Sequence, residues 1–311
     1  EKILLNLKGT VFQGNTLNIE IEGKDQEVNQ IITHLPINIQ KICSSFIANG
    51  KITFHSSLKG LMNKEKNPLF KMEYKITKGN FKLKAMPFEL YNVNMNGNVN
   101  NGEDRNFNST KITADLFKAE TKNGNINGAF MLTNLNKYFL TADVKSIWDL
   151  TEVNHYFEDS PFIGLQGELF ASTNYKGNIA FDKRFKRRFL DASHKSDIKL
   201  KNVNFNYKIS PLKFTFKSLN CKLENHKILV NSSESTISET DFNFKGEILN
   251  FIPYILEEAP KIYIDGDITS TYTNFYEVLS LGNISKKNNK SEATTIIPNW
   301  VNANTTIRIK N

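Results

Sequence analysis

The sequence predicts a mainly β protein, in which an antiparallel sheet built from large repeats carries a few short helices. Apolar and polar residues alternate with a period of two, as in VNFNYKI, where Val203, Phe205, Tyr207 and Ile209 point to one face. The segments between such stretches are rich in Asn and Gly, which favour turns. Strands with one apolar face are typical of antiparallel sheets, because buried parallel strands read as continuous apolar runs.

Length, charge and cysteine content restrict the class of protein. The chain has 311 residues, of which 39% are hydrophobic, so it can bury a large core. The net charge of +8 comes from lysines that alternate with apolar residues along the strands, which indicates a solvated face, and no nucleic acid partner is expected. Cys43 and Cys221 lie far apart without metal-type spacing and are predicted to fill apolar space.

Helical periodicity occurs in three places. In QEVNQIITHLP (26–36) the apolar residues recur at i, i+3, i+4 and i+7, and Pro36 ends the helix. SIWDLTEVNHYFEDSP (146–161) and ILNFIPYILEEAP (248–260) repeat the pattern of a strand that leads into a short helix. Helices are therefore predicted near 27–35, 146–156 and 250–257.

Internal similarity indicates a repeat architecture. GKITFHSSLKG (50–60) and GELFASTNYKG (167–177) share a G-x-aliphatic start and a terminal Lys-Gly, with a shift of 167 − 50 = 117 positions. Residues 80–97 resemble 204–221 at a shift of 204 − 80 = 124 positions. Because a repeat buries its apolar face by stacking on its neighbours, one continuous elongated body is predicted, with approximate units 1–137, 138–241 and 242–311, the last truncated.

The order of these segments resembles a known family. A short helix that carries Asp149-Leu150, a G-x-aliphatic strand, and strand pairs around a proline (KAMPFELYNVNMNG, KISPLKFTFKSLNC) are similar to AsmA-like proteins of Gram-negative bacteria. IIPNWVNANTTIRIK (296–310) resembles the start of a further unit. The resemblance covers most of the chain and implies an internal fragment of a longer protein.

The resemblance implies a periplasmic protein, held in the inner membrane by an N-terminal helix outside this chain. Such proteins are similar to bridge-like lipid-transfer proteins, in which a long, twisted β-sheet forms a groove for acyl chains. The expected function is phospholipid transport between the inner and outer membranes and outer-membrane homeostasis. Phospholipid acyl chains and the inner membrane are the expected partners, and outer-membrane proteins are candidates. The family supplies no catalytic residue and no cofactor, so no enzyme is expected.

The apolar faces of the strands are the candidate groove lining. The alternative is that the same residues pack on each other in a closed sandwich or barrel core. A second alternative is a non-transporting β scaffold that binds protein partners or glycans at the cell envelope. The candidate lining residues are Ile19, Ile21, Phe81, Leu83, Phe88, Leu90, Val203, Phe205, Tyr207, Ile209, Phe214 and Phe216.

Basic loops follow the G-x-aliphatic strands, and the strongest holds Arg184, Lys186, Arg187 and Arg188. These residues are candidates for contact with anionic lipid headgroups. The sequence favours a solvated edge that resists aggregation over contact with headgroups, and a surface for a partner protein is the remaining alternative.

Signals for catalysis or metal binding are weak. His155, Glu158 and Asp159 share one surface turn of a predicted helix, and no second histidine lies nearby. The DGD segment at 265–267 lacks the remaining oxygen ligands of a calcium loop and is predicted to be a turn. No G-x-S-x-G, P-loop or H-E-x-x-H motif is present. No catalytic, cofactor or metal site is therefore expected.

The repeat architecture predicts that the chain is elongated in solution. A globular chain of this length has a radius of gyration of about 19–20 Å. Small-angle scattering should give a clearly larger value, and a value in the globular range would contradict the predicted single elongated body.

Overall fold

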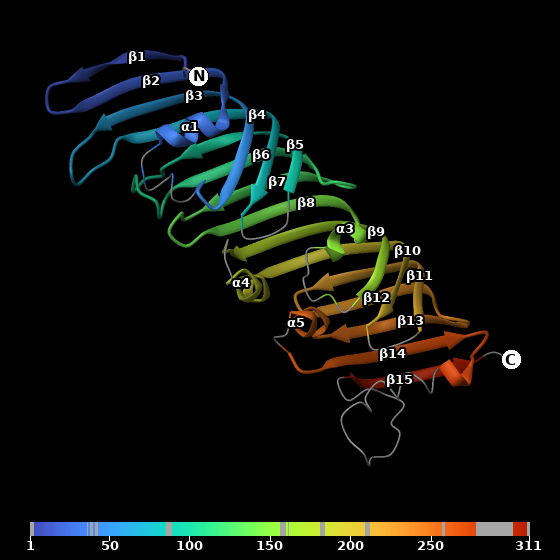
Figure 1. Cartoon of the computed structure of the whole chain (residues 1–311). Coiled ribbons are helices and arrows are strands. Elements are labelled where there is room, and N and C mark those ends of the chain that lie inside the picture. Colours follow the sequence, from blue (N-terminus) through green and yellow to red (C-terminus); the bar gives the residue numbers. More distant parts are fainter. Residues whose placement is uncertain are drawn as a thin grey trace. The chain divides into compact units, whose positions relative to one another are not determined.

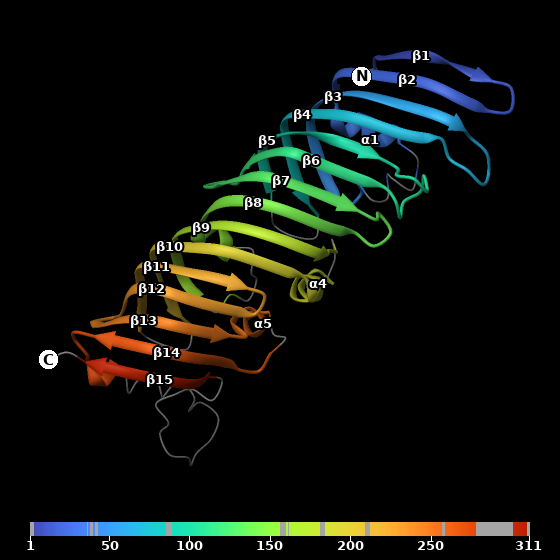
Figure 2. The same cartoon turned by 180° about the vertical axis from the view of Figure 1, so that it is seen from behind.

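The fold is that of a mainly β protein. The computed structural model describes residues 3–35, 37, 40, 43–84, 89–155, 160, 162–180, 184–208, 212–256, 259–277 and 301–309. Strands make up 68% of the chain and helices 11%, which confirms the predicted class. The strands follow one another in chain order, from β1 to β15, in one sheet, as Figures 1 and 2 show from opposite sides.

The chain divides into two units. Unit 1 comprises Glu1–Ser146 and Asn174–Ala192, and unit 2 comprises Ile147–Thr173 and Ser193–Asn311. The elements of unit 1 are β1 (Leu5–Phe12), β2 (Thr16–Glu27), α1 (Val28–His34), β3 (Phe46–Leu61), β4 (Leu69–Leu83), β5 (Glu89–Asn100), β6 (Lys111–Glu120), β7 (Asn125–Thr133) and α4 (Phe185–Asp191). Those of unit 2 are α3 (Leu150–Asn154), β10 (Ser193–Tyr207), β11 (Lys213–Glu224), β12 (Lys227–Ile237), β13 (Thr240–Leu249), α5 (Phe251–Ile255), β14 (Ile262–Ser270) and β15 (Val301–Ile309). Strands β8 (Phe139–Asp149) and β9 (Phe162–Asn178) contribute residues to both units.

Neighbouring strands are antiparallel within unit 1 from β1 to β7 and within unit 2 from β10 to β14. The last pair departs from the prediction, because β15 runs parallel to β14, with Ile262 opposite Val301. A parallel pair needs a crossover of a dozen or more residues, whereas a hairpin needs only a few. The long segment between Ser270 and Val301 provides that length.

The three predicted helices are present as α1, α3 and α5. A further helix, α4, occupies Phe185–Asp191, where the sequence was interpreted as a basic loop. The two predicted helices of unit 2 are not equivalent in position. Helix α3 precedes Phe162, whose ring lies 4.9 Å from that of Phe205 near the end of β10, whereas α5 follows Leu249 at the other end of the strands. The same local sequence pattern therefore places α3 and α5 at opposite ends of the strands, because the chain reverses its direction from each strand to the next.

The glycine that opens each repeated segment marks a bend. Gly50 in unit 1 has φ 123° and lies against Lys78, which has φ 52°; in unit 2 Gly167 has φ 120° and lies against Asn202, which has φ 51°. The two glycines are 167 − 50 = 117 positions apart and their two partners 202 − 78 = 124 positions apart, which are the shifts found in the sequence. An irregular pair of this kind bends both strands and strengthens their twist. The sequence repeat is thus a repeat of backbone geometry, although Gly266 on β14 has no left-handed residue opposite it, since neither Gly246 of β13 nor Thr305 of β15 has a positive φ.

Replacement of Gly167 by valine tests the bend. A Cβ atom there would meet the Asn202 carbonyl oxygen and the Val203 Cα at 2.7 Å each, and φ 120° is strained for any side chain. We expect Gly167→Val to lower the free energy of unfolding by about 2 kcal/mol or more. The exposed neighbour Glu168 gives the control, Glu168→Val, which should change the urea midpoint little. If Gly167→Val and Glu168→Val had the same urea midpoint, the claim that the backbone bend requires glycine at position 167 would be wrong.

Candidate functional site

An aromatic row crosses the apolar face of unit 2. The ring of Phe205 lies 4.9 Å from Phe162, 5.3 Å from Phe214 and 6.3 Å from Phe216, between centroids. Phe242 extends the row, 6.2 Å from Phe216. Such stacked and edge-to-face contacts stabilise the rings against one another. All five side chains are only half-buried, so the row offers apolar surface to a ligand.

The sequence predicted part of this row. Phe205, Tyr207, Phe214 and Phe216 were expected on one face, and register confirms it, since Phe205 pairs with Phe214 and Val203 with Phe216. Val203 is only 2% exposed and belongs to the packing beneath the face. Ile209 lies outside the described residues. Phe162 and Phe242 were missed, although the alternation in DFNF (241–244) contains the signal for the second.

The sheet of unit 2 curls toward this apolar face. Lys195 on β10 pairs with Glu224, Glu224 with Lys227, and Lys227 with Leu249, so these four residues mark one end of the strands. Tyr207 ends β10, 207 − 195 = 12 residues away, which is about 40 Å along a straight strand.

Helix α5 nevertheless reaches Tyr207 from the opposite end of the strands. Tyr254 follows Leu249 by 254 − 249 = 5 residues, which span at most about 18 Å, and its phenol lies close enough to that of Tyr207 for the two to interact. Only a curled sheet brings the two ends so close. We call the concave apolar face of unit 2 the trough. The strongly bent strands are visible in Figure 1.

The environment of this tyrosine pair is apolar. Burial, followed by the nearby Tyr207 hydroxyl and the hydrogen bond with it, raises the pKa of Tyr254 to about 12. All three effects disfavour the phenolate. The phenol of Tyr254 therefore stays protonated at all physiological pH values.

Aromatic rings lie against glycines on the apolar faces. In unit 1 the Phe54 ring covers Gly23 of the neighbouring strand, where an added Cβ would lie 2.5 Å from Cε1 of the ring. In unit 2 the Phe244 ring covers Gly246 and Gly266. Because glycine has no side chain, the ring can rest directly on the backbone of the neighbouring strand. The ring covers that strand, and the apolar surface stays close to the backbone.

The apolar face of unit 1 is closed where α1 covers it. Val28 of α1 packs in one buried cluster with Ile52, Tyr74 and Ile76, and Phe81 packs against that cluster. The Tyr74 hydroxyl donates to the Thr113 carbonyl oxygen at 2.8 Å. At this place the predicted lining residue Phe81 is therefore part of a core, as the closed-core alternative expects. The other predicted residues of unit 1 that the structure describes are half-buried on their strands, namely Ile19, Ile21, Leu83 and Leu90, whereas Phe88 lies outside the described residues.

The strands of unit 1 curl as well. Tyr138 precedes β8 at the end of the strands marked by Thr133, Lys111 and Ser57, whereas Cys43 precedes β3 at the other end. Burial, and then the proximity of Cys43, raises the pKa of Tyr138. Cys43 and Tyr138 therefore lie near each other, although they belong to opposite ends of the strands.

The predicted basic residues lie on or beside α4. Arg184 directly precedes this helix, and Lys186, Arg187 and Arg188 are exposed on it. The Phe189 ring stacks on Tyr175 of β9 with centroids 6.2 Å apart, and Leu190 is buried. The Arg187 Nε lies 3.2 Å from the Asp191 carboxylate, which is an exposed i, i+4 pair of small energetic value. The helix is thus anchored by two apolar residues and presents its cations to solvent.

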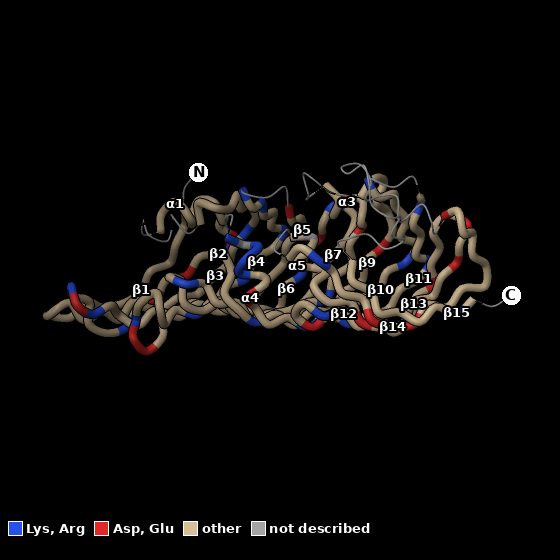
Figure 3. The backbone as a smooth tube through the Cα atoms, turned by 90° about the horizontal axis from the view of Figure 1, so that it is seen from below, with Lys and Arg blue, Asp and Glu red and all other residues tan. Residues whose placement is uncertain are grey.

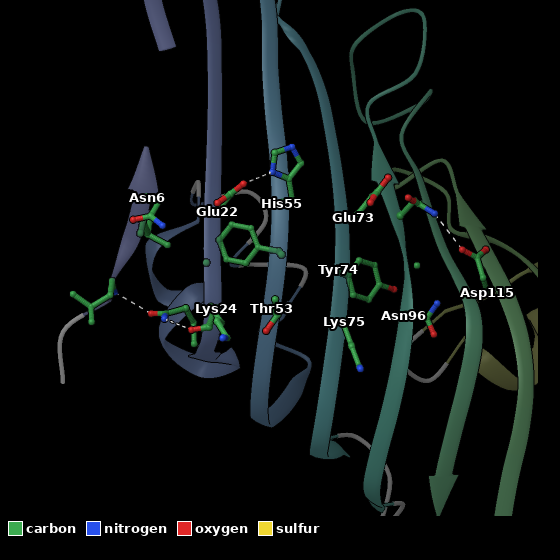
Figure 4. A pocket seen from close by; sticks show the side chains of 17 residues that line it. Asn6, Glu22, Lys24, Thr53, His55, Glu73, Tyr74, Lys75, Asn96 and Asp115 are labelled. Carbon is green, nitrogen blue, oxygen red and sulfur yellow. Dashed lines mark hydrogen bonds and ion pairs between the residues drawn. The ribbon is translucent and has the colours of Figure 1, made fainter. Parts of the chain in front are cut away.

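A pocket of about 1000 Å³, which we call the polar pocket, lies on β1 to β6 of unit 1 (Figure 4). Its lining combines a row of polar side chains with the apolar or aromatic residues Leu4, Leu5, Phe54 and Tyr74. The Glu22 carboxylate lies 3.2 Å from the His55 Nδ1, and the Asn98 amide donates to Asp115 at 3.1 Å. Lys24 also lines the pocket, so both signs of charge are present. Strand pairing places the polar side chains in a row across the strands, namely Asn6, Glu22, His55, Glu73 and Asn98. This pocket was not predicted, because in the sequence these polar residues resemble the outward-facing residues of any strand in which polar and apolar residues alternate.

The weak metal signals gain no support. Among the residues that the structure describes, no cluster of His, Cys, Asp and Glu could hold a metal ion. His155 contacts the Thr151 carbonyl oxygen, and Glu158 and Asp159 lie outside the description. Asp265 and Asp267 lie within strand β14 and not in the predicted turn, and they accept hydrogen bonds from Asn304 and Arg308 of β15.

Comparison with known proteins leaves the family open. No protein-family model, curated protein or solved structure matches this chain. Within the described residues, no helix is long and apolar enough to span a membrane.

Charge reversal on α4 tests its predicted contact with anionic lipids. We expect the variant with glutamate at Arg184, Lys186, Arg187 and Arg188 to fold normally, because these side chains are solvated, and to bind phosphatidylglycerol vesicles more weakly, since a basic residue near such a surface contributes about 1 kcal/mol. Cosedimentation at low salt measures the binding.

A matched variant reverses four exposed strand lysines of unit 1, Lys8, Lys82, Lys118 and Lys145, and carries the same change in net charge. If both variants lose binding equally, the effect is one of net charge. If the α4 variant binds as the unmodified protein does, the residues form a solvated edge.

Proposed function

We propose that this chain is the lipid-binding segment of an AsmA-like protein and takes part in phospholipid transport between the inner and outer membranes. The observation that carries the proposal is the half-exposed aromatic row inside the trough of unit 2. In this proposal Phe205, Phe214 and Phe216 contact acyl chains, and the longer protein is periplasmic and anchored in the inner membrane.

The physical chemistry of the trough supports this choice. A sixteen-carbon chain in water costs about 12 kcal/mol, at roughly 0.8 kcal/mol per methylene, so a phospholipid crosses an aqueous space only under an apolar cover. A concave apolar face supplies that cover. Over the glycines the apolar surface lies close to the backbone, which leaves room for the acyl chain. Because the bend recurs along the sequence, an acyl chain would find successive binding positions of similar energy, which favours sliding of the lipid along the sheet.

The second candidate is a non-transporting scaffold that binds glycans or protein partners. The polar pocket on β1 to β6 is the observation that favours it. Carboxylate, amide and lysine side chains of the pocket suit a polar ligand with little net charge. The two candidates are separated by mass spectrometry of lipid extracted from the purified protein, because only the first expects bound phospholipid.

The double variant Phe205→Asp, Phe214→Asp tests the proposed function. At an open apolar surface the carboxylates keep their hydration, so the variant should retain its strand circular dichroism and a cooperative melt but lose co-purifying phospholipid. In a closed core the same changes would combine lost packing of roughly 3–5 kcal/mol with unpaired buried charges.

Asn204→Asp, on the opposite face of the same strand, is the control and should retain both fold and lipid. If the double variant unfolds while the control stays folded, the apolar face is a closed core at this place and the proposed function loses its support.

A further inference from the structure

We infer that the polar pocket of unit 1 is a binding site for zwitterionic groups, in which an ammonium and a phosphate or carboxylate are joined by a short link. The inference rests on the second candidate function, which places a polar ligand in this pocket, and it names the chemical class of that ligand. It is independent of lipid binding in the trough, because the pocket lies on the polar face of unit 1.

Two rows of exposed polar side chains form the walls of the pocket, as the upper and lower labels of Figure 4 show. Strand pairing aligns the first row, which we call the acidic wall and which consists of Asn6, Glu22, His55, Glu73, Asn98 and Asp115. The second row, which we call the basic wall, consists of Lys24, Thr53, Lys75 and Asn96. The pocket therefore has walls of opposite charge and is open to water.

The floor between the two walls carries no protruding side chain. Phe54 and Tyr74 lie between the rows, but their side chains belong to the opposite face, where both pack with Val28 of α1 in the buried cluster. Gly23 pairs with Phe54 and Gly97 pairs with Tyr74, and neither glycine has a side chain. A ligand can therefore lie between the walls without displacing a side chain of the floor.

An acidic and a basic residue stand two positions apart on each of two strands. Glu22 and Lys24 belong to β2, and Glu73 and Lys75 belong to β4. Residues at i and i+2 of a strand share a face and lie about 7 Å apart, which suits the two charges of a short zwitterion. Because β2 and β4 both pair with β3, the two acid–lysine pairs form two subsites about 10 Å apart.

The charged groups of the subsites are available to a ligand. Within the ranges that the structure describes, the ammonium groups of Lys24 and Lys75 and the carboxylate of Glu73 make no hydrogen bond or ion pair. Each of them can pair with a ligand without first breaking a contact within the protein.

The balance of charge excludes other ligand classes. The pocket holds three carboxylates and two lysines. The acidic wall repels a polyanion and the basic wall repels a polycation, whereas an acyl chain would cover charges that need water. Since an exposed ion pair strengthens binding at most about fivefold, we expect a weak site that salt weakens further.

The first experiment titrates the full chain with O-phosphorylethanolamine, whose ammonium and phosphate are joined by an ethylene link. The chain contains only 5 histidines, so the ring resonance of His55 can be followed with isotope-labelled histidine and identified with His55→Gln. At low salt the resonance should shift in a saturable manner. The dissociation constant should be about fivefold or more below those of ethylamine and inorganic phosphate, because only the zwitterion pairs with both walls.

The second experiment reverses the charge of each wall. The acidic-wall variant combines Glu22→Lys with Glu73→Lys, and the basic-wall variant combines Lys24→Glu with Lys75→Glu. Each should weaken binding of O-phosphorylethanolamine about fivefold or more, since one end of the ligand then meets a like charge. A variant with all four changes exchanges the signs of the walls and should bind as the unmodified protein does, because a small zwitterion can turn end for end.

Lys8→Glu combined with Lys71→Glu is the matched control for the basic-wall variant. Both lysines are exposed on unit 1 outside the pocket, and the change in net charge is the same. This control should bind the zwitterion as the unmodified protein does. Circular dichroism and the urea midpoint of every variant should match those of the unmodified protein, because all of these side chains are solvated.

Zwitterionic groups occur both free in solution and as headgroups on a membrane surface, and vesicle flotation distinguishes these sources. The vesicles contain phosphatidylcholine and phosphatidylethanolamine and have no net charge. Two subsites would engage neighbouring headgroups together, which strengthens binding to a surface. Flotation that both wall variants abolish and the fourfold variant restores assigns the site to headgroups. Saturable binding of O-phosphorylethanolamine without flotation assigns it to a free ligand, and either result supports the site.

Three results would overturn the inference. The first is a His55 resonance that does not respond to the zwitterion. The second is tighter binding by the acidic-wall variant, because the pocket would then be a simple anion site. The third is a response to N-acetylglucosamine and none to the zwitterion, which would leave the second candidate function standing with a neutral glycan as ligand. Phospholipid that co-purifies with the protein is measured separately, so the zwitterion site and the lipid function can fail independently.

Discussion

The structure depends on one constraint: a sheet that is apolar on one face must curl toward that face while its strands keep their hydrogen bonds. Straight strands of the lengths found here would leave the apolar face flat and open to water. Bulges resolve the conflict, since an extra residue bends the strand and interrupts the ladder at one place only. In unit 1 such residues stand on four consecutive strands, at Asp25, Gly50, Lys78 and Asn92, each with positive φ.

The curl determines the chemistry of the two faces. On the apolar side the rims approach each other, and short helices or single side chains can reach from one rim to the other. Where α1 fills that space in unit 1, a closed core forms around Ile52 and Ile76. In unit 2 the aromatic row stays half-exposed. The same strand pattern thus gives a core in one unit and an accessible surface in the other, according to what covers it.

The polar side has a different role. Figure 3 shows Lys and Arg interspersed with Asp and Glu along the chain, and ion pairs such as Lys195–Glu224 and Lys217–Glu234 cross between neighbouring strands. These pairs are exposed, so each contributes at most about 1 kcal/mol. Their main effect is on register and solubility, because a strand that slipped by one residue would bring apolar side chains to this face. At the polar pocket the row of polar groups lines a hollow large enough for a ligand.

The sequence by itself determined the mainly β class, the alternation of faces, the three helices at α1, α3 and α5, and the repeated bend at Gly50 and Gly167. These features are local: a period of two, a period of 3.6 and a glycine in a left-handed conformation are each set by a few neighbouring residues. Tertiary structure decided the rest. Helix α4 depends on Phe189 finding Tyr175, the parallel β15 depends on a long crossover, and the position of α5 on the rim opposite α3 depends on how many hairpins lie between them. None of these can be derived from a short window, because each is set by contacts between residues far apart in the chain, and the same holds for Tyr207 and Tyr254, which meet only because the sheet between them curls.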